Sequence, residues 1–184
     1  MRYVAFLRAI NVGGHTVRME ELRRLFESMG ATNVQTFIAS GNVIFDSTVK
    51  KERELEQWIE AGLETALKFP VGTFLRSLPE VAAVAACPIF SAAEIEGAAA
   101  LYVGFLKTAP PEAACATVSA ASTAAHQFRV HDRELYWLRA SLADEYEAPK
   151  FDKALGASTV RSITTIRKIA AKHCDPIGDK KKSS

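Results

Sequence analysis

The sequence predicts an α+β protein built from two consecutive units that pack into one body. Of the 184 residues, 48% are hydrophobic and 24% are charged, which is an ordinary globular composition. A chain of this length can bury a core without disulfides or a metal. Short apolar runs alternate with helical periodicities in the same order in both halves, which indicates an internal duplication of pattern rather than of sequence.

The first half begins with a strand, a loop and a helix. Tyr3 to Ala9 is a short apolar run that ends at Asn-Val-Gly-Gly, a pattern typical of a buried strand followed by a loop. From Met19 to Met29 the apolar residues recur at intervals of three and four, and Glu20 and Glu21 favour the first turn of a helix. Gly30 predicts the end of this helix.

A hairpin, a second helix and a fourth strand complete the first unit. Val34 to Ala39 and Val43 to Asp46 are predicted strands, and the residues between them, Ser40-Gly41-Asn42, are typical of a hairpin turn. Lys50 to Leu67 carries its apolar residues on one helical stripe, and Val71 to Leu75 is the last strand. This β-α-β-β-α-β order is the split β-α-β arrangement, so the unit is predicted to be ferredoxin-like.

The second unit repeats the order as β-α-β-β-α after an alanine-rich helix at Pro79 to Ala86. Its predicted elements, followed by one more helix, are Leu101 to Leu106, Pro110 to Ala121, Phe128 to Val130, Leu135 to Leu138, Lys150 to Leu155 and Thr164 to Lys172. We therefore expect two consecutive ferredoxin-like units packed together. The expected boundaries are residues 1–78 for the first unit, 79–97 for a helical linker, 98–174 for the second unit with its C-terminal helix, and 175–184 for a disordered tail.

The strands are apolar on both alternating faces, which predicts how the units pack. A half-solvated antiparallel sheet alternates apolar and polar residues, whereas the runs YVAF, LYVGFL and LYWL do not. Helices can cover one face of each sheet. The partner unit is expected to cover the other face, and a homodimer contact is the alternative.

Composition disfavours several classes of protein. Lys and Arg number 23 against 21 Asp and Glu, spread evenly over both halves, which disfavours a nucleic-acid-binding domain with its clustered basic charge. The three cysteines are far apart and form no CxxC pair, as expected of reduced thiols in the cytoplasm. No export signal or bilayer-length apolar run is visible, so we expect a cytoplasmic protein outside the membrane. The histidines show no metal-ligand spacing, so no metal is expected.

Topology predicts a candidate site at one edge of the first sheet. With a right-handed crossover, the loop after the first strand and the hairpin turn lie at the same edge, close to a helix N-terminus. Backbone N–H groups and the helix dipole favour an anionic ligand there. The predicted ligand-binding residues are Arg8, Asn11, Gly13, Gly14, Ser40, Gly41, Asn42 and, from a second segment, Arg161.

Each of these predictions has a structural alternative. Glycines in short loops more often supply a positive φ, and Asn and Ser in turns more often bond their own backbone. Arg8 ends an apolar strand and needs either a ligand or a structural ion pair. Arg161 lies beside the start of the last helix, where an anion could join them, although Ser162 or Thr164 could simply cap that helix.

Three motifs resemble one known family. The stretch FLRAINVGG from Phe6 to Gly14, the helix start Met19-Glu20-Glu21-Leu22-Arg23 and SGNVIF from Ser40 to Phe45 resemble the N-terminal signature of the bacterial domain-of-unknown-function family 1697. Before the last helix the family typically reads Thr-Thr-Arg-Asn-Trp-x-Thr. Arg161 and Thr165 match this motif here, whereas Ser162 and Ile163 replace the Asn and Trp. The resemblance implies ferredoxin-like units in a cytosolic protein and implies no activity.

Three functions are compatible with the sequence. The first is binding or catalysis on a small anionic molecule at the predicted edge. The second is RNA or DNA binding on a ferredoxin-like sheet, which is disfavoured because SGNVIF lacks a basic start and alternating aromatic residues. The third is a protein-interaction module. Whether the protein is an enzyme, which cofactor it uses and its oligomeric state stay open.

Overall fold

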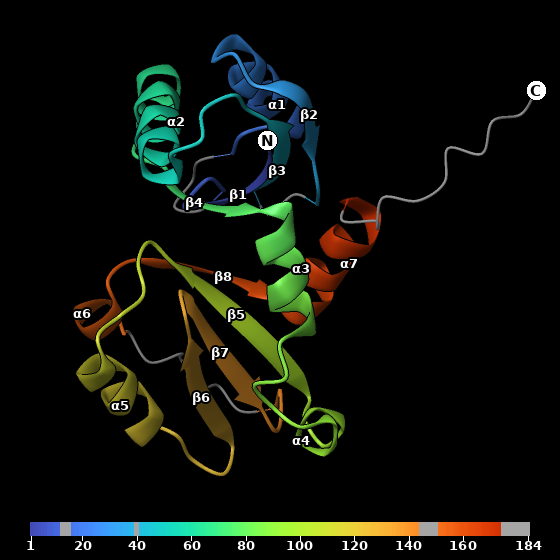
Figure 1. Ribbon diagram of the computed structural model, residues 1–184, viewed down its shortest axis with the longest axis vertical. Coiled ribbons are helices and arrows are strands. Elements are labelled where there is room, and N and C mark those ends of the chain that lie inside the picture. The colour runs from blue at the N-terminus through green and yellow to red at the C-terminus, as the bar shows by residue number, and fades with distance from the viewer. Residues whose placement is uncertain (12–15, 39–40, 144–150, 174–184) are drawn as a thin grey trace, which may run out of the picture.

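The computed structural model describes residues 1–11, 16–38, 41–143 and 151–173 (Figure 1). The first unit has the predicted β-α-β-β-α-β order, and its antiparallel sheet has the strand order β2-β3-β1-β4. Its elements are β1 (Arg2–Arg8), α1 (Met19–Ser28), β2 (Thr32–Thr36), β3 (Asn42–Asp46), α2 (Glu52–Leu67) and β4 (Gly72–Ser77). The expected disordered tail lies outside the described residues.

The second unit has the same arrangement, with the strand order β6-β7-β5-β8. Its elements are β5 (Ala100–Leu106), α5 (Glu112–Ala120), β6 (His126–His131), β7 (Glu134–Arg139), α6 (Asp152–Leu155) and β8 (Ser158–Ser162). The sequence-based expectation missed β8, which pairs with β5 from Tyr102↔Ser162 to Leu106↔Ser158. The segment STVRS has a single aliphatic residue, so its hydrophobic pattern carries no strand signal. With β8 in place, two packed ferredoxin-like units are confirmed.

Three further helices lie between and after the two sheets. The predicted linker helix is α3 (Leu78–Ala86), and it packs against α7 (Ile163–His173), as Figure 1 shows. Val81 and Ile166 on these helices are fully buried in the core between the units. The short α4 (Ala92–Glu96) was not predicted, and a capping box formed by Ser91 and Glu94 starts it. No helix in the described ranges has the length and apolar character needed to cross a bilayer.

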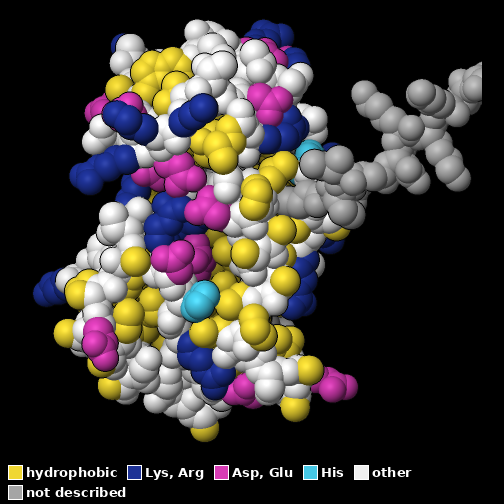
Figure 2. All heavy atoms as spheres, in the orientation of Figure 1, with side chains coloured by type: hydrophobic (Ala, Val, Ile, Leu, Met, Phe, Trp, Pro, Cys, Tyr) yellow, Lys and Arg dark blue, Asp and Glu magenta, His cyan; other side chains and the backbone are white. Residues whose placement is uncertain are grey.

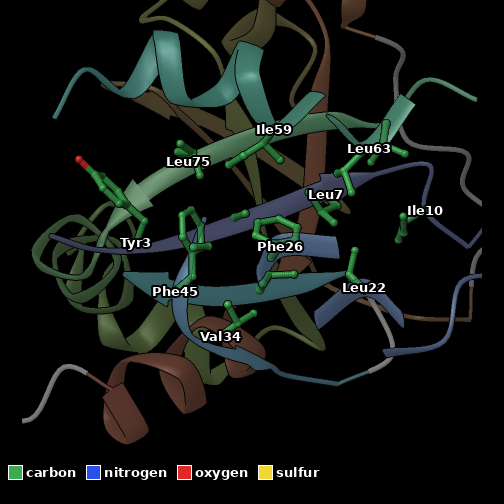
Figure 3. Packing of buried hydrophobic residues seen from close by; sticks show 14 of the residues in the cluster. Tyr3, Leu7, Ile10, Leu22, Phe26, Val34, Phe45, Ile59, Leu63 and Leu75 are labelled. Carbon is green, nitrogen blue, oxygen red and sulfur yellow. The ribbon is translucent and has the colours of Figure 1, made fainter. Parts of the chain in front are cut away.

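Apolar side chains form three layers, so the first sheet is covered on both faces, whereas the described residues cover the outer face of the second sheet only in part. One layer lies between the first sheet and helices α1 and α2, where Phe26, Phe45 and Leu63 pack together (Figure 3). The middle layer joins the two sheets, and the stacked rings of Phe6 and Phe105 lie 3.9 Å apart in it. A smaller layer lies between α5 and the second sheet.

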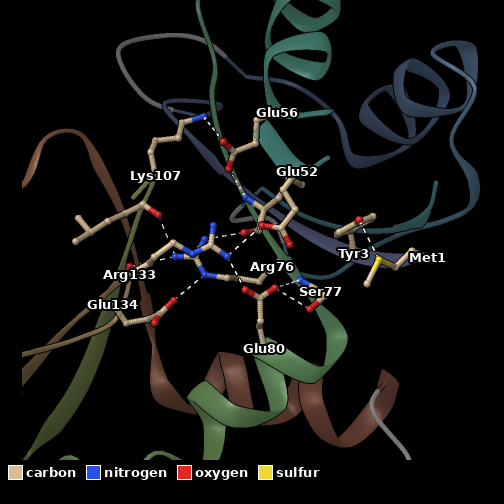
Figure 4. Close-up of polar contacts among 12 residues, drawn as sticks. Met1, Tyr3, Glu52, Glu56, Arg76, Ser77, Glu80, Lys107, Arg133 and Glu134 are labelled. Carbon is tan, nitrogen blue, oxygen red and sulfur yellow. Dashed lines mark hydrogen bonds and ion pairs between the residues drawn. The ribbon is translucent and has the colours of Figure 1, made fainter. Parts of the chain in front are cut away.

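A band of charged residues crosses the junction between the units (Figure 2). Arg76 donates to Glu134 at 2.6 Å, and Arg133 bridges Glu52 and Glu80 (Figure 4). Burial raises the pKa of the Glu52 carboxyl, and the neighbouring charge of Glu80 adds to this shift. The pKa of Glu80 is lowered although burial opposes it, because Ser77 and Arg133 donate hydrogen bonds to its carboxylate. The junction is therefore fastened by ion pairs as well as by apolar packing.

Candidate functional site

The end of β1 and the β2–β3 connection lie side by side, as the topology predicted. Phe6 is the register partner of Asn42, and the Leu7 backbone N–H donates to the Gly41 carbonyl at 2.8 Å. Gly41 has φ of 71°, and a Cβ there would lie only 2.6 Å from the side chain of Ile10. Backbone conformation and close packing therefore both require glycine at this position.

Of the remaining loop residues of the predicted site, only Asn11 is among the described residues. The Asn11 Oδ1 accepts a hydrogen bond from the Val17 backbone N–H at 2.9 Å, which closes the loop before α1. Gly13, Gly14 and Ser40 lie outside the described residues, so their predicted contribution is untested. Asn11 in this position acts on its own loop, as Asn commonly does in turns.

Asn42 and Arg161 meet inside the junction between the units. The Arg161 Nε donates to the Asn42 Oδ1 at 2.6 Å, and its Nη2 donates to the Leu7 carbonyl at 2.8 Å. Asn42 in turn donates to the Phe37 carbonyl at 3.0 Å. Burial lowers the pKa of Arg161 to about 10. These contacts tie β8 to the first unit, and a ligand role for either residue stays a prediction.

Ser162 carries out the structural role that was the alternative at this segment. Its Oγ accepts a hydrogen bond from the Thr165 backbone N–H at 3.2 Å, which satisfies an N–H in the first turn of α7. The side chain of Arg161 points to the first unit, where it donates to Asn42 and to the Leu7 carbonyl. The hydroxyl at Ser162 therefore needs no ligand to explain it.

Arg8 has a different environment from Arg161. Its side chain is 41% exposed, and its Nη2 lies 3.4 Å from the Asp152 carboxylate of α6, which is itself 52% exposed. This single long ion pair leaves most of the guanidinium donors accessible. Neither a second carboxylate nor tight packing encloses Arg8 among the described residues. The ligand prediction for Arg8 therefore keeps the geometry it requires.

Arg8 and Asp152 stand at a cavity of about 260 Å³, which we call the aromatic pocket. Its lining residues are Arg8, Tyr102, Gly104, Phe128, Leu135, Trp137, Phe151, Asp152, Ser158 and Val160. Among the described residues, α6 is a single turn of four residues, whereas α2 in the corresponding place of the first unit has 16. The described residues therefore leave the outer face of the second sheet partly uncovered, and Val160 is 46% exposed.

Three aromatic rings form a row across neighbouring strands in this pocket. Trp137 is the register partner of both Phe128 and Tyr102, and its ring centroid lies 6.0 Å and 5.2 Å from theirs. The Trp137 Nε1 donates to the His126 Nδ1 at 3.2 Å, which fixes the orientation of the indole. Phe151 packs edge-on against Phe128. The row therefore offers an ordered surface for a flat apolar group.

Gly104 lies beside this row in the interior of β5. Its register partners are Leu135 and Val160, and a Cβ at Gly104 would meet them at 3.5 Å and 3.7 Å, which is ordinary contact. Glycine is thus not required by sterics here, and its missing side chain deepens the pocket. A glycine inside a strand often marks a close approach by a ligand or another backbone.

Sequence reasoning did not find most of this pocket. Tyr102 and Trp137 were counted only as apolar strand residues, and Asp152 was assigned only to a helix. Gly104 inside an otherwise apolar run was the one available signal, because glycine is depleted in strand interiors. The residues that line the pocket together with Gly104 could not be identified without knowing that β5 pairs with β7 and β8.

A larger hollow of about 420 Å³ lies between α2 and the second unit, but Lys107, Arg133 and the glutamates that line it are already paired with one another. Lys107 contacts Glu56 at 3.3 Å and Glu60 at 2.7 Å, and Arg133 contacts Glu52 at 3.1 Å. Ligand groups would have to compete with these internal partners. The aromatic pocket is therefore the better candidate site despite its smaller volume.

Comparison with known proteins adds a family and a fold. A family model described as "Protein of unknown function (DUF1697)" matches residues 1–136. The conserved bacterial protein SP0830 from Streptococcus pneumoniae is similar in structure, with a TM-score of 0.71 and 23% sequence identity over 93% of this chain and 97% of that one. This likeness shows a shared fold. No protein with a curated description matches the chain.

Proposed function

Because the chain belongs to the family of proteins of unknown function DUF1697, whose description states no activity, we propose a function from the geometry of its own site. The aromatic pocket binds a small molecule that has a flat apolar body and an anionic group. The observation that carries this proposal is the position of the half-exposed Arg8 beside the ordered rings of Tyr102 and Trp137.

The polar side of the pocket suits an anion. An exposed ion pair such as Arg8–Asp152 contributes only about 0–1 kcal/mol, so Arg8 can exchange partners at little cost. A guanidinium presents parallel N–H donors that match a carboxylate or a phosphate. The rim of the pocket can therefore hold the charged end of a ligand.

The apolar side suits a flat ring. A ligand ring that packs on aromatic side chains gains about 0.5–1.5 kcal/mol beyond the area that it buries. Pockets for small molecules are typically apolar and contain a few polar groups that fix orientation. The described polar groups of this pocket can orient a ligand for binding.

Nucleic-acid binding is the second candidate, because the aromatic row lies on a ferredoxin-like sheet. Sheets of this fold that bind RNA stack bases on such rings. Against this, the opposite face of the same sheet is covered by the first unit, and Arg8 is the one cation among the described residues that line the pocket. RNA affinity at physiological salt that disappears in Trp137→Ala would favour this candidate over a small molecule.

Replacing Arg8 tests the anionic end of the ligand. We expect Arg8→Ala to weaken binding of 3-phenylpropanoate or 1-naphthyl phosphate by at least about tenfold, which corresponds to ~1.4 kcal/mol. The free energy of unfolding should change by less than about 1 kcal/mol, because the ion pair with Asp152 is exposed. Titration calorimetry and urea unfolding measure the two effects.

The matched control for this variant is Arg24→Ala, since Arg24 is an exposed arginine on α1 far from the pocket lining. Equal binding losses in both variants would show only a general charge effect. A large loss of stability in Arg8→Ala without any loss of binding would establish the structural ion pair instead.

Filling the pocket tests its apolar end. We expect Gly104→Val to abolish binding of the same aromatic anions while stability stays equal or rises by about 0.5–1 kcal/mol, because valine is favoured over glycine inside a strand. Its Cβ would meet Leu135 and Val160 at ordinary contact distances. Gly97→Ala at the end of α4 is the control glycine. Unchanged binding in Gly104→Val would place the ligand outside the aromatic pocket.

A further inference from the structure

The aromatic pocket has two opposite charges at its rim, and both are accessible. The Arg8 Nη2 and the Asp152 Oδ2 lie 3.4 Å apart, and the two side chains are 41% and 52% exposed. They come from different units, Arg8 from β1 and Asp152 from α6. A ligand whose charged end reaches Arg8 therefore also lies close to a carboxylate.

A purely anionic ligand fits this rim poorly. Its negative group would neutralise Arg8 but would lie beside Asp152, and like charges at this distance repel. A ligand with a neighbouring positive group removes that repulsion and replaces the internal ion pair with two new pairs. Resting on the function proposed above, we propose that the ligand class is a zwitterionic aromatic α-amino acid, with its carboxylate on Arg8 and its ammonium group on Asp152.

The dimensions of the site support a ligand of this size. The cavity of about 260 Å³ is smaller than the ~300–1,000 Å³ of sites for drug-sized molecules. An α-amino acid carries both charged groups on one carbon, so they are neighbours just as Arg8 and Asp152 are neighbours. A single ring of its side chain then lies over Gly104, between Tyr102 and Val160, where the strand has no side chain.

Three ligands that differ only in charge test this inference on the full-length protein. They are L-phenylalanine, 3-phenylpropanoate, which lacks the ammonium group, and 2-phenylethylamine, which lacks the carboxylate. We expect L-phenylalanine to bind at least about tenfold more tightly than either of the others, since each loses one charged contact. Titration calorimetry or ligand-observed NMR measures the three affinities.

Variants of the two rim residues assign each charge. Asp152→Asn should weaken the binding of L-phenylalanine, because it removes the attraction between the carboxylate of Asp152 and the ammonium group of the ligand. The same variant should strengthen the binding of 3-phenylpropanoate, because it removes the repulsion between the two carboxylates. Arg8→Ala should weaken the binding of both of these ligands, whereas 2-phenylethylamine should bind equally well or more tightly. Because Arg8 and Asp152 are both about half exposed, the melting temperatures of the two variants should stay near that of the unaltered protein.

The outcomes separate this inference from the function on which it rests. The proposal of a zwitterionic ligand is overturned if 3-phenylpropanoate binds as tightly as L-phenylalanine, or if Asp152→Asn leaves the ratio of the two affinities unchanged. In either case the proposal of a pocket for aromatic anions stands. The zwitterion is likewise overturned if L-phenylalanine fails to bind while 1-naphthyl phosphate binds in a manner that Gly104→Val abolishes. If none of the aromatic ligands binds at millimolar concentration, both proposals fail.

Discussion

Arg76→Met is expected to lower the free energy of unfolding by about 3–5 kcal/mol, because it leaves a buried carboxylate without its partner. Arg76 is 1% exposed and donates to Glu134 at 2.6 Å across the junction between the units. Its Nη2 also donates to the carbonyls of Leu106 and Arg133, each at 3.0 Å. One side chain from the first sheet thus satisfies three acceptors of the second unit.

Urea unfolding followed by circular dichroism measures this effect. The double variant Arg76→Met with Glu134→Leu should recover part of the loss, because it removes the orphaned charge. Arg23→Met is the matched control, since Arg23 pairs with Glu20 on the exposed surface of α1 and its loss should lower the free energy of unfolding far less. Equal losses in Arg76→Met and Arg23→Met would contradict a junction held by a buried ion pair.

Residues 1–78 expressed alone are expected to aggregate. In the whole chain Val4, Phe6, Ile44 and Phe74 are at most 1% exposed, and they face the second unit in the middle apolar layer. Separation exposes this face as one apolar patch, and such patches drive association. The fragment also loses Glu134, the partner of Arg76.

Size-exclusion chromatography and analytical ultracentrifugation report the state of the fragment. The matched control is the same fragment with Val4→Thr, Phe6→Thr and Ile44→Thr, which keeps the helix-facing residues and makes the exposed face more polar. This control should be markedly more soluble. A monomeric fragment of natural sequence that unfolds cooperatively would contradict the view that the units are inseparable.

Much of the fold follows from local patterns. The apolar spacing around Leu22 and Phe26 identified α1, and the turn sequence Ser40-Gly41-Asn42 identified the β2–β3 hairpin. Apolar residues on both faces of β1 predicted two covering layers, which the buried Tyr3 and Phe6 occupy on opposite sides. These features depend on neighbours within a few residues, so periodicity alone reveals them.

The candidate site was predicted only in part, because its two arginines have different surroundings. Both Arg8 and Arg161 were predicted to bind an anion. Arg161 fastens the units by donating to Leu7, 154 residues away, and its ligand role stays a prediction, whereas Arg8 lies at the open pocket. Nothing in the residues next to either arginine distinguishes these environments. These environments depend on the pairing of β8 with β5, and the weak hydrophobic pattern of β8 did not predict that pairing.

Local patterns in the sequence predicted the two repeated units, the order of the elements in the first unit and the covering of both faces of the first sheet, because hydrophobic burial imposes a period on neighbouring residues. Tertiary packing was needed to show that the described residues leave part of the outer face of the second sheet uncovered and that Tyr102, Gly104 and Trp137 meet there with Arg8. These residues are separated by up to 129 positions along the chain, from Arg8 to Trp137. Their meeting depends on strand register and on the packing of one unit against the other, which no local period encodes.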